Sequence, residues 1–239
     1  KRPDLLNASQ YRQVHEAARL HYLNDVQNGI LPAPAPNSAA GLALKTPMAD
    51  TGIDTNWLDY VLRTGAITNN QFSFSAGGDS SKLYFSVGNI SQEGIIKQDK
   101  FDISRVRLNV EQKISNKIRV GVNSYFSYRS SVPIVDDNNT YQPYSNAMNA
   151  APNLAPYGAD GKPNKNLTSN NPLWAFERVV TDRYQTIGSN FYAVYNPIKD
   201  LTLKTSISGN IMSRRYNRFD APDTRRGEQA GKPWGYGYY

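Results

Sequence analysis

The chain has 239 residues, a formal net charge of +7, two histidines and no cysteine. The lack of cysteine excludes a disulfide scaffold, a thiol nucleophile and a thiolate zinc site. No apolar run reaches the roughly 18 residues of a transmembrane helix, whereas a hydrophobic content of 39% is compatible with a membrane β-barrel, whose strands are apolar on one face only.

Residues 1–68 contain one predicted helix, over residues 7–24. Asn7 is a suitable N-cap for it, and apolar residues follow at helical spacing. The stretch 28–54 is rich in proline, alanine, glycine and asparagine and is predicted to be irregular. We therefore expect residues 1–68 to form a long loop that contains a helix.

From residue 69 the hydrophobic period changes from 3.6 to 2, and this pattern continues to residue 213. Strict alternation predicts strands with one apolar and one polar face. Six strands are expected, over about residues 71–77, 82–93, 101–114, 118–131, 184–196 and 200–213. The fold class is therefore all-β, an antiparallel up-and-down meander.

The connections between these strands are alternately short and long. Tight turns rich in Gly, Asn, Asp, Ser or Pro join the first strand to the second, the third to the fourth and the fifth to the sixth. A long loop over residues 132–183 separates the fourth and fifth strands, and residues 214–239 are expected to begin the next long loop or strand. Turns at one end of the sheet and loops at the other are typical of transmembrane β-barrels.

A soluble antiparallel sandwich is the alternative, because its strands alternate as well. Strands longer than the usual five to six residues and charged residues on one face of nearly every strand favour the membrane barrel. Six strands cannot close such a barrel, because eight is the practical minimum. We therefore expect this sequence to be a piece of a longer protein that supplies further strands.

The run from Tyr84 to Ile96 ends in Gln92-Glu93-Gly94-Ile95-Ile96 and resembles the second and third barrel strands of SusC/RagA-type TonB-dependent outer-membrane transporters. Further motifs resemble the family in order and spacing along nearly the whole chain. They include Leu5–Ala8, Asn56-Trp57, Phe101–Arg105, Arg107–Asn109, Ile118–Asn123, Ala150–Pro152, Asn171–Leu173 and Asn196–Leu201.

This resemblance implies part of a 22-stranded barrel whose plug domain is absent from the sequence. It implies import of large nutrients, more often a glycan or oligosaccharide than a peptide, and no enzymatic activity or cofactor. The implied partners are a SusD-type surface lipoprotein, TonB through the missing plug segment, outer-membrane lipid and a nutrient oligomer as solute. The family also includes dimers of transporter–lipoprotein pairs, and the implied location is the outer membrane of a Gram-negative, Bacteroidetes-type bacterium. Residues 1–68 would then be an extracellular loop.

The barrel interpretation assigns the two faces of the strands to lipid and to a wet lumen. Val106, Leu108, Val110, Ile118, Val120 and Val122 are expected to face lipid. The lumen-facing residues are expected to be Arg105, Arg107, Arg119, Asn123, Lys204 and Asn210. Aromatic residues in the long loop suit contact with a sugar or a protein lid, although they also suit packing of the loop on itself. The candidates are Tyr141, Tyr144, Tyr157 and Trp174.

Other functions have weaker support in the sequence. The basic residues are scattered and accompany no nucleic-acid-binding motif, so no nucleic-acid partner is expected. His15 and His21 do not share a face of the expected helix, and residues 136–139 (Asp-Asp-Asn-Asn) lack the spacing of a calcium loop, so no catalytic or metal site is predicted. A soluble all-β carbohydrate-binding module and a passive porin-like barrel remain as alternatives.

Overall fold

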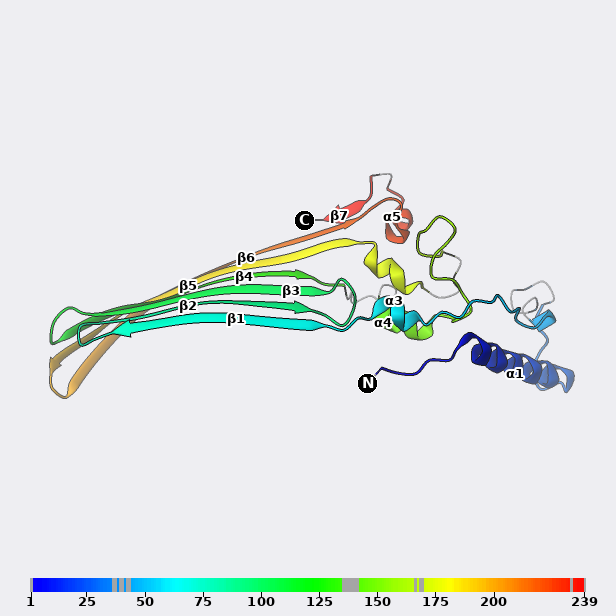
Figure 1. Ribbon diagram of the computed structural model, residues 1–239, viewed down its shortest axis with the longest axis horizontal. Coiled ribbons are helices and arrows are strands. Elements are labelled where there is room, and N and C mark those ends of the chain that lie inside the picture. Colours follow the sequence, from blue (N-terminus) through cyan, green and yellow to red (C-terminus); the bar gives the residue numbers. More distant parts are fainter. Residues whose placement is uncertain are drawn as a thin grey trace. The chain divides into compact units, whose positions relative to one another are not determined.

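The computed structural model describes residues 2–35, 38, 41, 44–134, 142–165, 167, 170–232 and 234–238. By its internal contacts the chain divides into two compact units. We call residues 1–62 with 135–175 the loop unit, and residues 63–134 with 176–239 the sheet unit. The whole β-sheet lies in the sheet unit, and the long helix α1 lies in the loop unit (Figure 1).

The sheet is an antiparallel meander in which every strand pairs with its neighbour in sequence. This confirms the predicted fold class, with a short seventh strand added to the six long ones. The strands are β1 (Ala66–Gly77), β2 (Ser81–Glu93), β3 (Lys100–Lys113), β4 (Ile118–Val132), β5 (Val179–Ile198), β6 (Leu201–Asp220) and β7 (Tyr236–Tyr238).

Several strands extend beyond the stretches in which hydrophobicity alternates. Strand β1 begins at Ala66 rather than near residue 71, although its first residues are largely polar. Strand β5 includes 179–183, which were expected to belong to the long loop, and β6 includes 214–220, which were expected to begin the next long loop or strand. These additions pair with each other, as Val179 does with Phe219. Backbone pairing, which a hydrophobic pattern does not report, therefore sets the strand ends.

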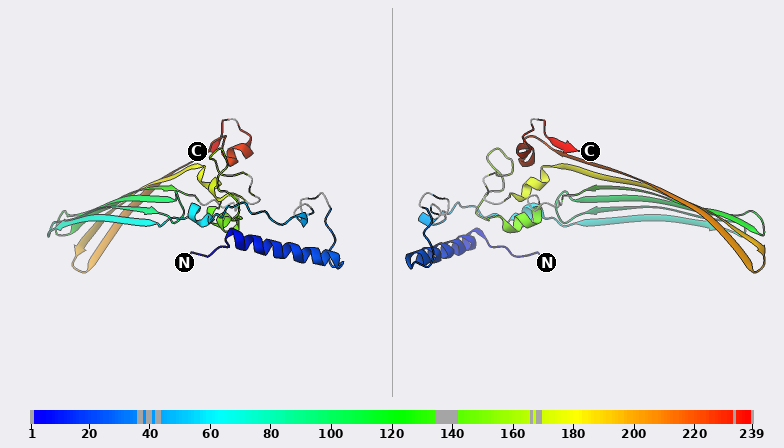
Figure 2. Two further views of the ribbon diagram at one scale, coloured as in Figure 1. Left: turned by 45° about the vertical axis from the view of Figure 1, so that its right-hand side comes forward. Right: turned by 180° about the vertical axis from the view of Figure 1, so that it is seen from behind.

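The three tight turns lie together at one end of the sheet, and the β2–β3 connection lies at the other (Figure 1). The strands twist and curve along their length (Figure 2), as long antiparallel strands do. Beyond β6, the short helix α5 (Arg225–Ala230) begins at Thr224, whose side chain accepts a hydrogen bond from the Gly227 amide.

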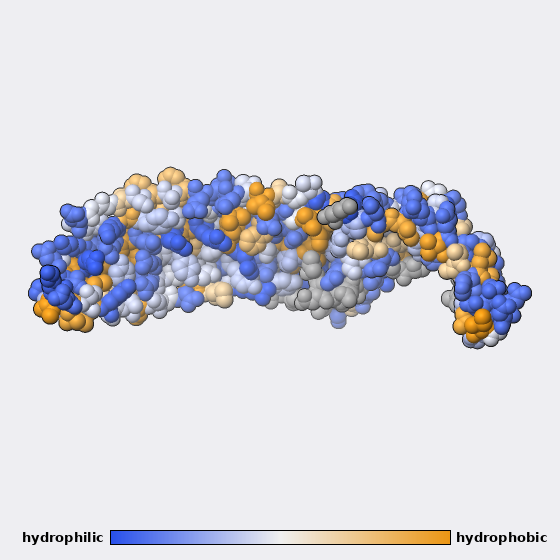
Figure 3. All heavy atoms as spheres, turned by 90° about the horizontal axis from the view of Figure 1, so that it is seen from below, coloured by the Kyte–Doolittle hydropathy of each residue, from blue (hydrophilic) through white to orange (hydrophobic). Residues whose placement is uncertain are grey.

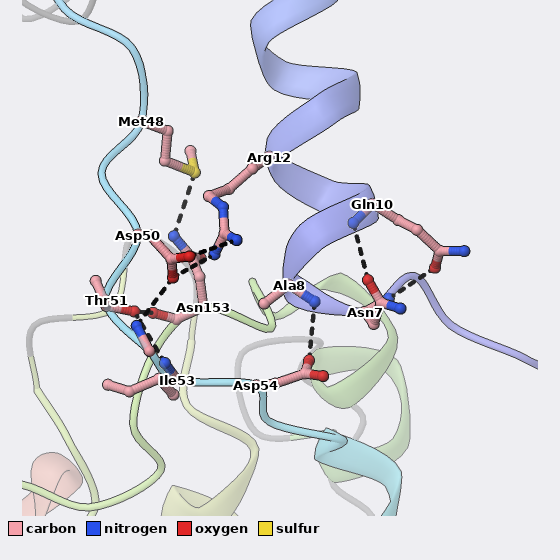
Figure 4. Close-up of polar contacts among 11 residues, drawn as sticks. Asn7, Ala8, Gln10, Arg12, Met48, Asp50, Thr51, Ile53, Asp54 and Asn153 are labelled. Atoms are coloured by element: carbon pink, nitrogen blue, oxygen red, sulfur yellow. Dashed lines mark hydrogen bonds and ion pairs between the residues drawn. The ribbon is translucent and has the colours of Figure 1, made fainter.

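The loop unit begins with helix α1 (Ala8–Gln27). Asn7 is its N-cap, as predicted, and forms a capping box with Gln10 (Figure 4). A bidentate ion pair joins Arg12 to Asp50 at 2.7 and 2.8 Å, and the Ala8 amide donates to Asp54 at 2.8 Å. The extended segment around residues 50–54 is therefore held against the first turns of α1.

The core of the loop unit is built by segments that lie far apart in the sequence. Helix α3 (Trp57–Val61) packs with α4 (Pro143–Asn149), and the 3-10 helix η2 (Pro172–Phe176) contributes further buried residues. The Trp57 side chain is 1% exposed, and its indole N–H donates to the Ala151 carbonyl at 2.9 Å. The sequence predicted no helix at α4 or η2, because each is too short to show a helical period.

Asn171 is a second anchor of the loop unit. Its side chain is fully buried and donates to the carbonyls of Pro156 and Asn164 at 2.9 and 3.1 Å. Its carbonyl oxygen accepts from the Leu173 amide at 2.9 Å, which fixes the start of η2. The expected first loop and the expected long loop thus fold together into one compact unit.

Among the described residues, no helix is long and apolar enough to cross a membrane.

Candidate functional site: the two faces of the sheet

The strand register determines which side chains share a face of the sheet. Directly paired residues project to the same side, and successive residues project to opposite sides. One row of paired residues crosses all six long strands, and every member is apolar. The row consists of Phe72, Val87, Val106, Phe126, Ile187 and Ile211. We call the face that carries this row the apolar face and the opposite one the polar face.

The apolar face is apolar over a limited height only. Toward the turns, this face stays apolar on β4 from Phe126 to Ile118 apart from Ser124, about 26 Å along the strand at about 3.3 Å per residue, whereas on β3 it ends at Val110, before Gln112. The turns beyond them carry charged residues such as Asp79, Lys117 and Asp200. In the other direction the next row contains only polar residues and one tyrosine. It consists of Asn70, Asn89, Ser104, Tyr128, Gln185 and Ser213.

The apolar band is therefore bounded by polar residues at both of its edges. On β4 its length along the strand is close to the apolar band of about 25 Å that surrounds membrane barrels. Ser124 and Ser189 lie opposite each other inside the band, and their hydroxyl groups hydrogen-bond to each other at 2.7 Å. Each of these two hydroxyl groups thus has a partner within the band.

The apolar band is open to the surroundings. Ile187 is 56% exposed and Ile211 is 75% exposed, and every residue of β1 is exposed. Figure 3 shows hydrophobic residues at the surface among hydrophilic ones. A soluble sandwich would bury such a row against a second sheet, so this exposure disfavours the sandwich alternative. Contiguous apolar surface of this kind marks an interaction with lipid or protein.

The polar face carries an excess of basic side chains along its strands. The basic residues are Lys82, Arg105, Arg107, Lys113, Arg119, Arg129, Lys204, Arg214 and Arg218. The acidic residues are Glu111, Asp182 and Asp220. This imbalance of charge gives the face a positive potential.

Glu111 organises the part of the polar face that lies near the turns. Its carboxylate lies 3.7 Å from Lys82 and 3.9 Å from Arg119, on the two neighbouring strands. The hydroxyl of Tyr192 donates to it at 2.8 Å. The Tyr192 ring crosses its direct partner Gly121, where an added Cβ would lie 2.2 Å from the ring.

A second cluster lies toward the loop end of the same face. Tyr184 lies between two arginines, with the Arg129 guanidinium 3.8 Å and the Arg214 guanidinium 5.0 Å from its ring centre. Arg214 also makes a bidentate ion pair with Asp182 at 2.9 and 3.1 Å. Both arginines of this cluster are therefore engaged with other side chains of the face.

Arg63 fixes the β2–β3 connection at the loop end of the sheet. Its guanidinium donates to the carbonyls of Gly94 and Asp99 at 3.0 and 2.9 Å and lies 3.2 Å from the Glu93 carboxylate. Burial raises the pKa of the Asp99 carboxyl, and the charge of Arg63 opposes that shift. The Arg63 side chain thus joins both ends of the β2–β3 connection.

The predicted lumen-facing residues Arg105, Arg107, Arg119, Asn123 and Lys204 all project from the polar face, as does Asn210, and all six are exposed. The predicted lipid-facing residues Val106, Leu108, Val110, Ile118, Val120 and Val122 all project from the apolar face. The register thus separates the two sets, and their assignment to lumen and lipid stays a prediction.

The loop aromatics have different environments. Tyr144 and Tyr157 are 38% and 48% exposed, and the Tyr157 ring makes an edge contact with Tyr60 at 6.2 Å. Trp174 is only 5% exposed within η2, so its ring has little surface to offer a solute or a lid. Tyr141 and the segment 136–139 lie outside the described residues. The described residues contain no group of three or more potential metal ligands.

Sequence reasoning missed Glu111, Tyr125, Tyr184 and Tyr192. The tyrosines alternate correctly for the polar face, but their importance depends on the residues opposite them. Tyr125 lies across from Gly188, as Tyr192 lies across from Gly121. A glycine directly opposite a tyrosine on the polar face identifies such a ring position, but only once the strand register is known.

Comparisons with known proteins identify relatives of the chain. It is 29% identical over 175 residues to TonB-dependent receptor P3 and 26% identical over 173 residues to TonB-dependent receptor P26, both of Formosa agariphila. These alignments cover 70% of this chain but only 18% and 17% of the relatives. No family model matches the chain.

Solved structures resemble the chain over nearly its whole length. A chain of the RagAB peptide importer in its closed-closed state matches 97% of it with a TM-score of 0.66 and 20% identity. A chain of the RagAB peptide transporter matches 93% with a TM-score of 0.66 and 19% identity. The match covers 27% of each of those chains. The expected resemblance to SusC/RagA-type TonB-dependent transporters, as part of their barrel, is thereby confirmed.

Proposed function

We propose that this chain is a wall segment of a TonB-dependent outer-membrane importer of large nutrients. The observation that carries the proposal is the bounded apolar band on one face of a sheet whose other face is polar and basic. A barrel wall needs this combination, because its outer surface contacts lipid and its inner surface contacts water and solute. Kinship to TonB-dependent receptors supports the choice of an energised importer over a passive porin.

In this proposal the apolar face contacts lipid and the polar face lines the lumen. The tight turns lie on the periplasmic side, and the β2–β3 connection and the loop unit lie on the extracellular side. Because an open sheet edge in lipid leaves backbone groups unsatisfied, β1 and the far side of β6 pair with further strands of the same barrel. The complete barrel in this proposal has 22 strands and contains a plug, as large outer-membrane transporters do.

The proposed partners follow from the same assignment. A SusD-type lipoprotein would cover the barrel on the loop side, where Tyr144 and Tyr157 are exposed. TonB would act through a plug domain, and two transporter–lipoprotein pairs would form the dimer. The resemblance favours a glycan as solute over a peptide, although the RagAB structures that the fold resembles are those of a peptide importer.

Uptake measurements in the organism that carries the full-length gene test this function. We expect that deleting the gene abolishes growth on one class of nutrient oligomer and that deleting tonB abolishes it equally. Growth on the monomer of the same nutrient is the control and should continue in both strains. Uptake that survives loss of TonB would instead support the passive porin.

A further inference from the structure

Two arginines of the polar face differ from its other arginines, because their side chains have no protein partner. Within the described part of the chain, the side chains of Arg105 and Arg107 take part in no hydrogen bond, ion pair or ring contact. Arg119 and Arg214, by contrast, face Glu111 and Asp182. Arg105 and Arg107 are exposed and project from the same face of β3, with Cα atoms about 7 Å apart. Two like charges this close together repel each other, so the positions of Arg105 and Arg107 are not explained by a contribution to the stability of the sheet.

The two arginines line a groove of about 590 Å³ on the sheet, which we call the arginine groove. Polar side chains of four other strands surround them there, namely Gln71, Tyr84, Ser86, Tyr125, Ser127 and Thr186. The direct partner of Arg105 on β2 is Gly88, and the atom nearest to a Cβ added there is 3.5 Å away. The groove is therefore open beside Arg105, because Gly88 has no side chain to fill it.

The arginine groove lies behind the loop-side edge of the apolar band. Val106, between the two arginines, belongs to the last complete apolar row, and the next row on that face is polar. With the apolar face toward lipid, the groove faces the lumen near its extracellular mouth. A solute that enters from outside would meet this level before the Glu111 cluster near the turns.

We propose that the arginine groove binds anionic groups, carboxylate or sulfate, of an oligosaccharide solute. This inference rests on the proposed function and names the substrate class. Guanidinium groups bind carboxylate and sulfate-like anions through paired, charge-assisted hydrogen bonds. Two arginines whose Cα atoms lie about 7 Å apart on one face of a strand suit an oligomer that carries repeated charges.

The other side chains in the groove favour a sugar over an acidic peptide. Hydroxyl and amide groups such as those of Ser86, Gln71 and Thr186 suit the hydroxyl groups of a sugar, and Tyr84 and Tyr125 provide rings on which a sugar can stack. Two apolar side chains that project from the polar face of the sheet, those of Ile90 and Ile103, also line the groove, and both lie at one end of it. A peptide with apolar side chains would find few contacts elsewhere in it.

Binding to the purified full-length transporter tests the proposal. The probes are hexamers of galacturonic acid, of sulfated galactose and of uncharged galactose, together with a hexapeptide of glutamate, each measured by calorimetry. We expect at least one anionic sugar to bind about tenfold or more tightly than the uncharged one, because each charge-assisted contact strengthens binding by about that factor. Added salt should weaken this preference.

Matched variants separate a site from general charge. Arg105→Gln with Arg107→Gln should abolish the preference for the anionic sugar, and Lys117→Gln with Lys199→Gln, which removes the same charge from two turns, should preserve it. Gly88→Val retains every charge but fills the groove and should weaken binding of the anionic sugar. It also keeps the test valid if the arginine double variant does not fold.

The outcomes are distinguishable from failure of the proposed function. A transporter that takes up oligomers through TonB but binds charged and uncharged sugars equally would overturn the anionic site alone. The anionic site would also be overturned if the turn variants reduced the preference as much as the groove variants. Preferential binding of the glutamate hexapeptide would overturn the assignment to a sugar. If the unmodified transporter showed no TonB-dependent uptake, this would contradict the function on which the site rests.

Discussion

At the residue scale, the polar face depends on tyrosines that lie across glycines. Tyr192 covers Gly121 and Tyr125 covers Gly188, and in both cases an added Cβ would collide with the ring. Tyr192 reaches Glu111 only because Gly121 leaves room for its ring. The alternation of the strands predicted that these tyrosines share the polar face. It could not predict their glycine partners, because the sequence does not contain the register.

Gly121→Val should destabilise the barrel by displacing the Tyr192 ring. We expect a loss of about 1–3 kcal/mol in the free energy of unfolding, as for other overpacked sites, measured by urea denaturation of the full-length protein in lipid. Gly209→Val is the matched control, because Gly209 is also in a strand but has open space where a Cβ would be placed. Equal effects of the two substitutions would contradict the steric explanation.

At the element scale, neighbouring residues of one strand have opposite roles. Val122 projects from the apolar face and Asn123 from the polar face of β4. The sequence was sufficient to assign both, because alternation fixes the face without any knowledge of the register. The polar row that ends the band was not apparent, because it is recognised only when six strands are aligned.

Val122→Lys should cost about 2–4 kcal/mol of folding free energy in a bilayer, as expected for a lysine that faces the centre of the hydrocarbon region. Asn123→Lys, one residue further along, should cost much less because its side chain faces water. Unfolding in lipid vesicles measures both changes. If the two lysines were equally costly, the assignment of the faces to lipid and lumen would fail.

Arg63 should control the mobility of the β2–β3 connection. Arg63→Gln removes the donors to the Gly94 and Asp99 carbonyls, so amide hydrogen exchange over residues 94–99 should accelerate. Arg63→Lys retains the charge but not the forked geometry and should have an intermediate effect. Exchange that remains unchanged in both variants would show that the backbone alone holds this connection.

Trp57 should control the stability of the loop unit. Trp57→Ala removes a buried ring and its hydrogen bond to Ala151, a change that costs about 3–5 kcal/mol at comparable sites. Trp57→Phe should cost less, because most of the buried volume remains. Hydrogen exchange of residues 51–62 and 143–154 should be fastest in Trp57→Ala and intermediate in Trp57→Phe, whereas amides of β3 and β4 should retain their protection. Loss of protection in β3 and β4 as well would contradict a local role for Trp57.

At the scale of the whole molecule, the sequence predicted the meander and its resemblance to transporters but not the loop unit. Strands of this length have a period that can be counted. The packing of residues 1–62 with 135–175 depends on single anchors such as Trp57 and Asn171, which meet partners far away in the sequence. Within the candidate site, the basic residues were predicted individually. Which of their side chains have a protein partner could be seen only from the strand register.

The central claim is that the apolar face contacts lipid while the polar face contacts a wet lumen. This chain contains no cysteine, so after any cysteine elsewhere in the full-length protein is replaced by serine, single cysteines are placed at Val122 and Ile187 on one face and at Asn123 and Asn190 on the other. Each is labelled with a fluorescent probe in the full-length protein, folded in a bilayer. We predict that spin-labelled acyl chains quench the probes at Val122 and Ile187, and that aqueous iodide quenches those at Asn123 and Asn190. Equal quenching on both faces, or the reverse pattern, would contradict this account.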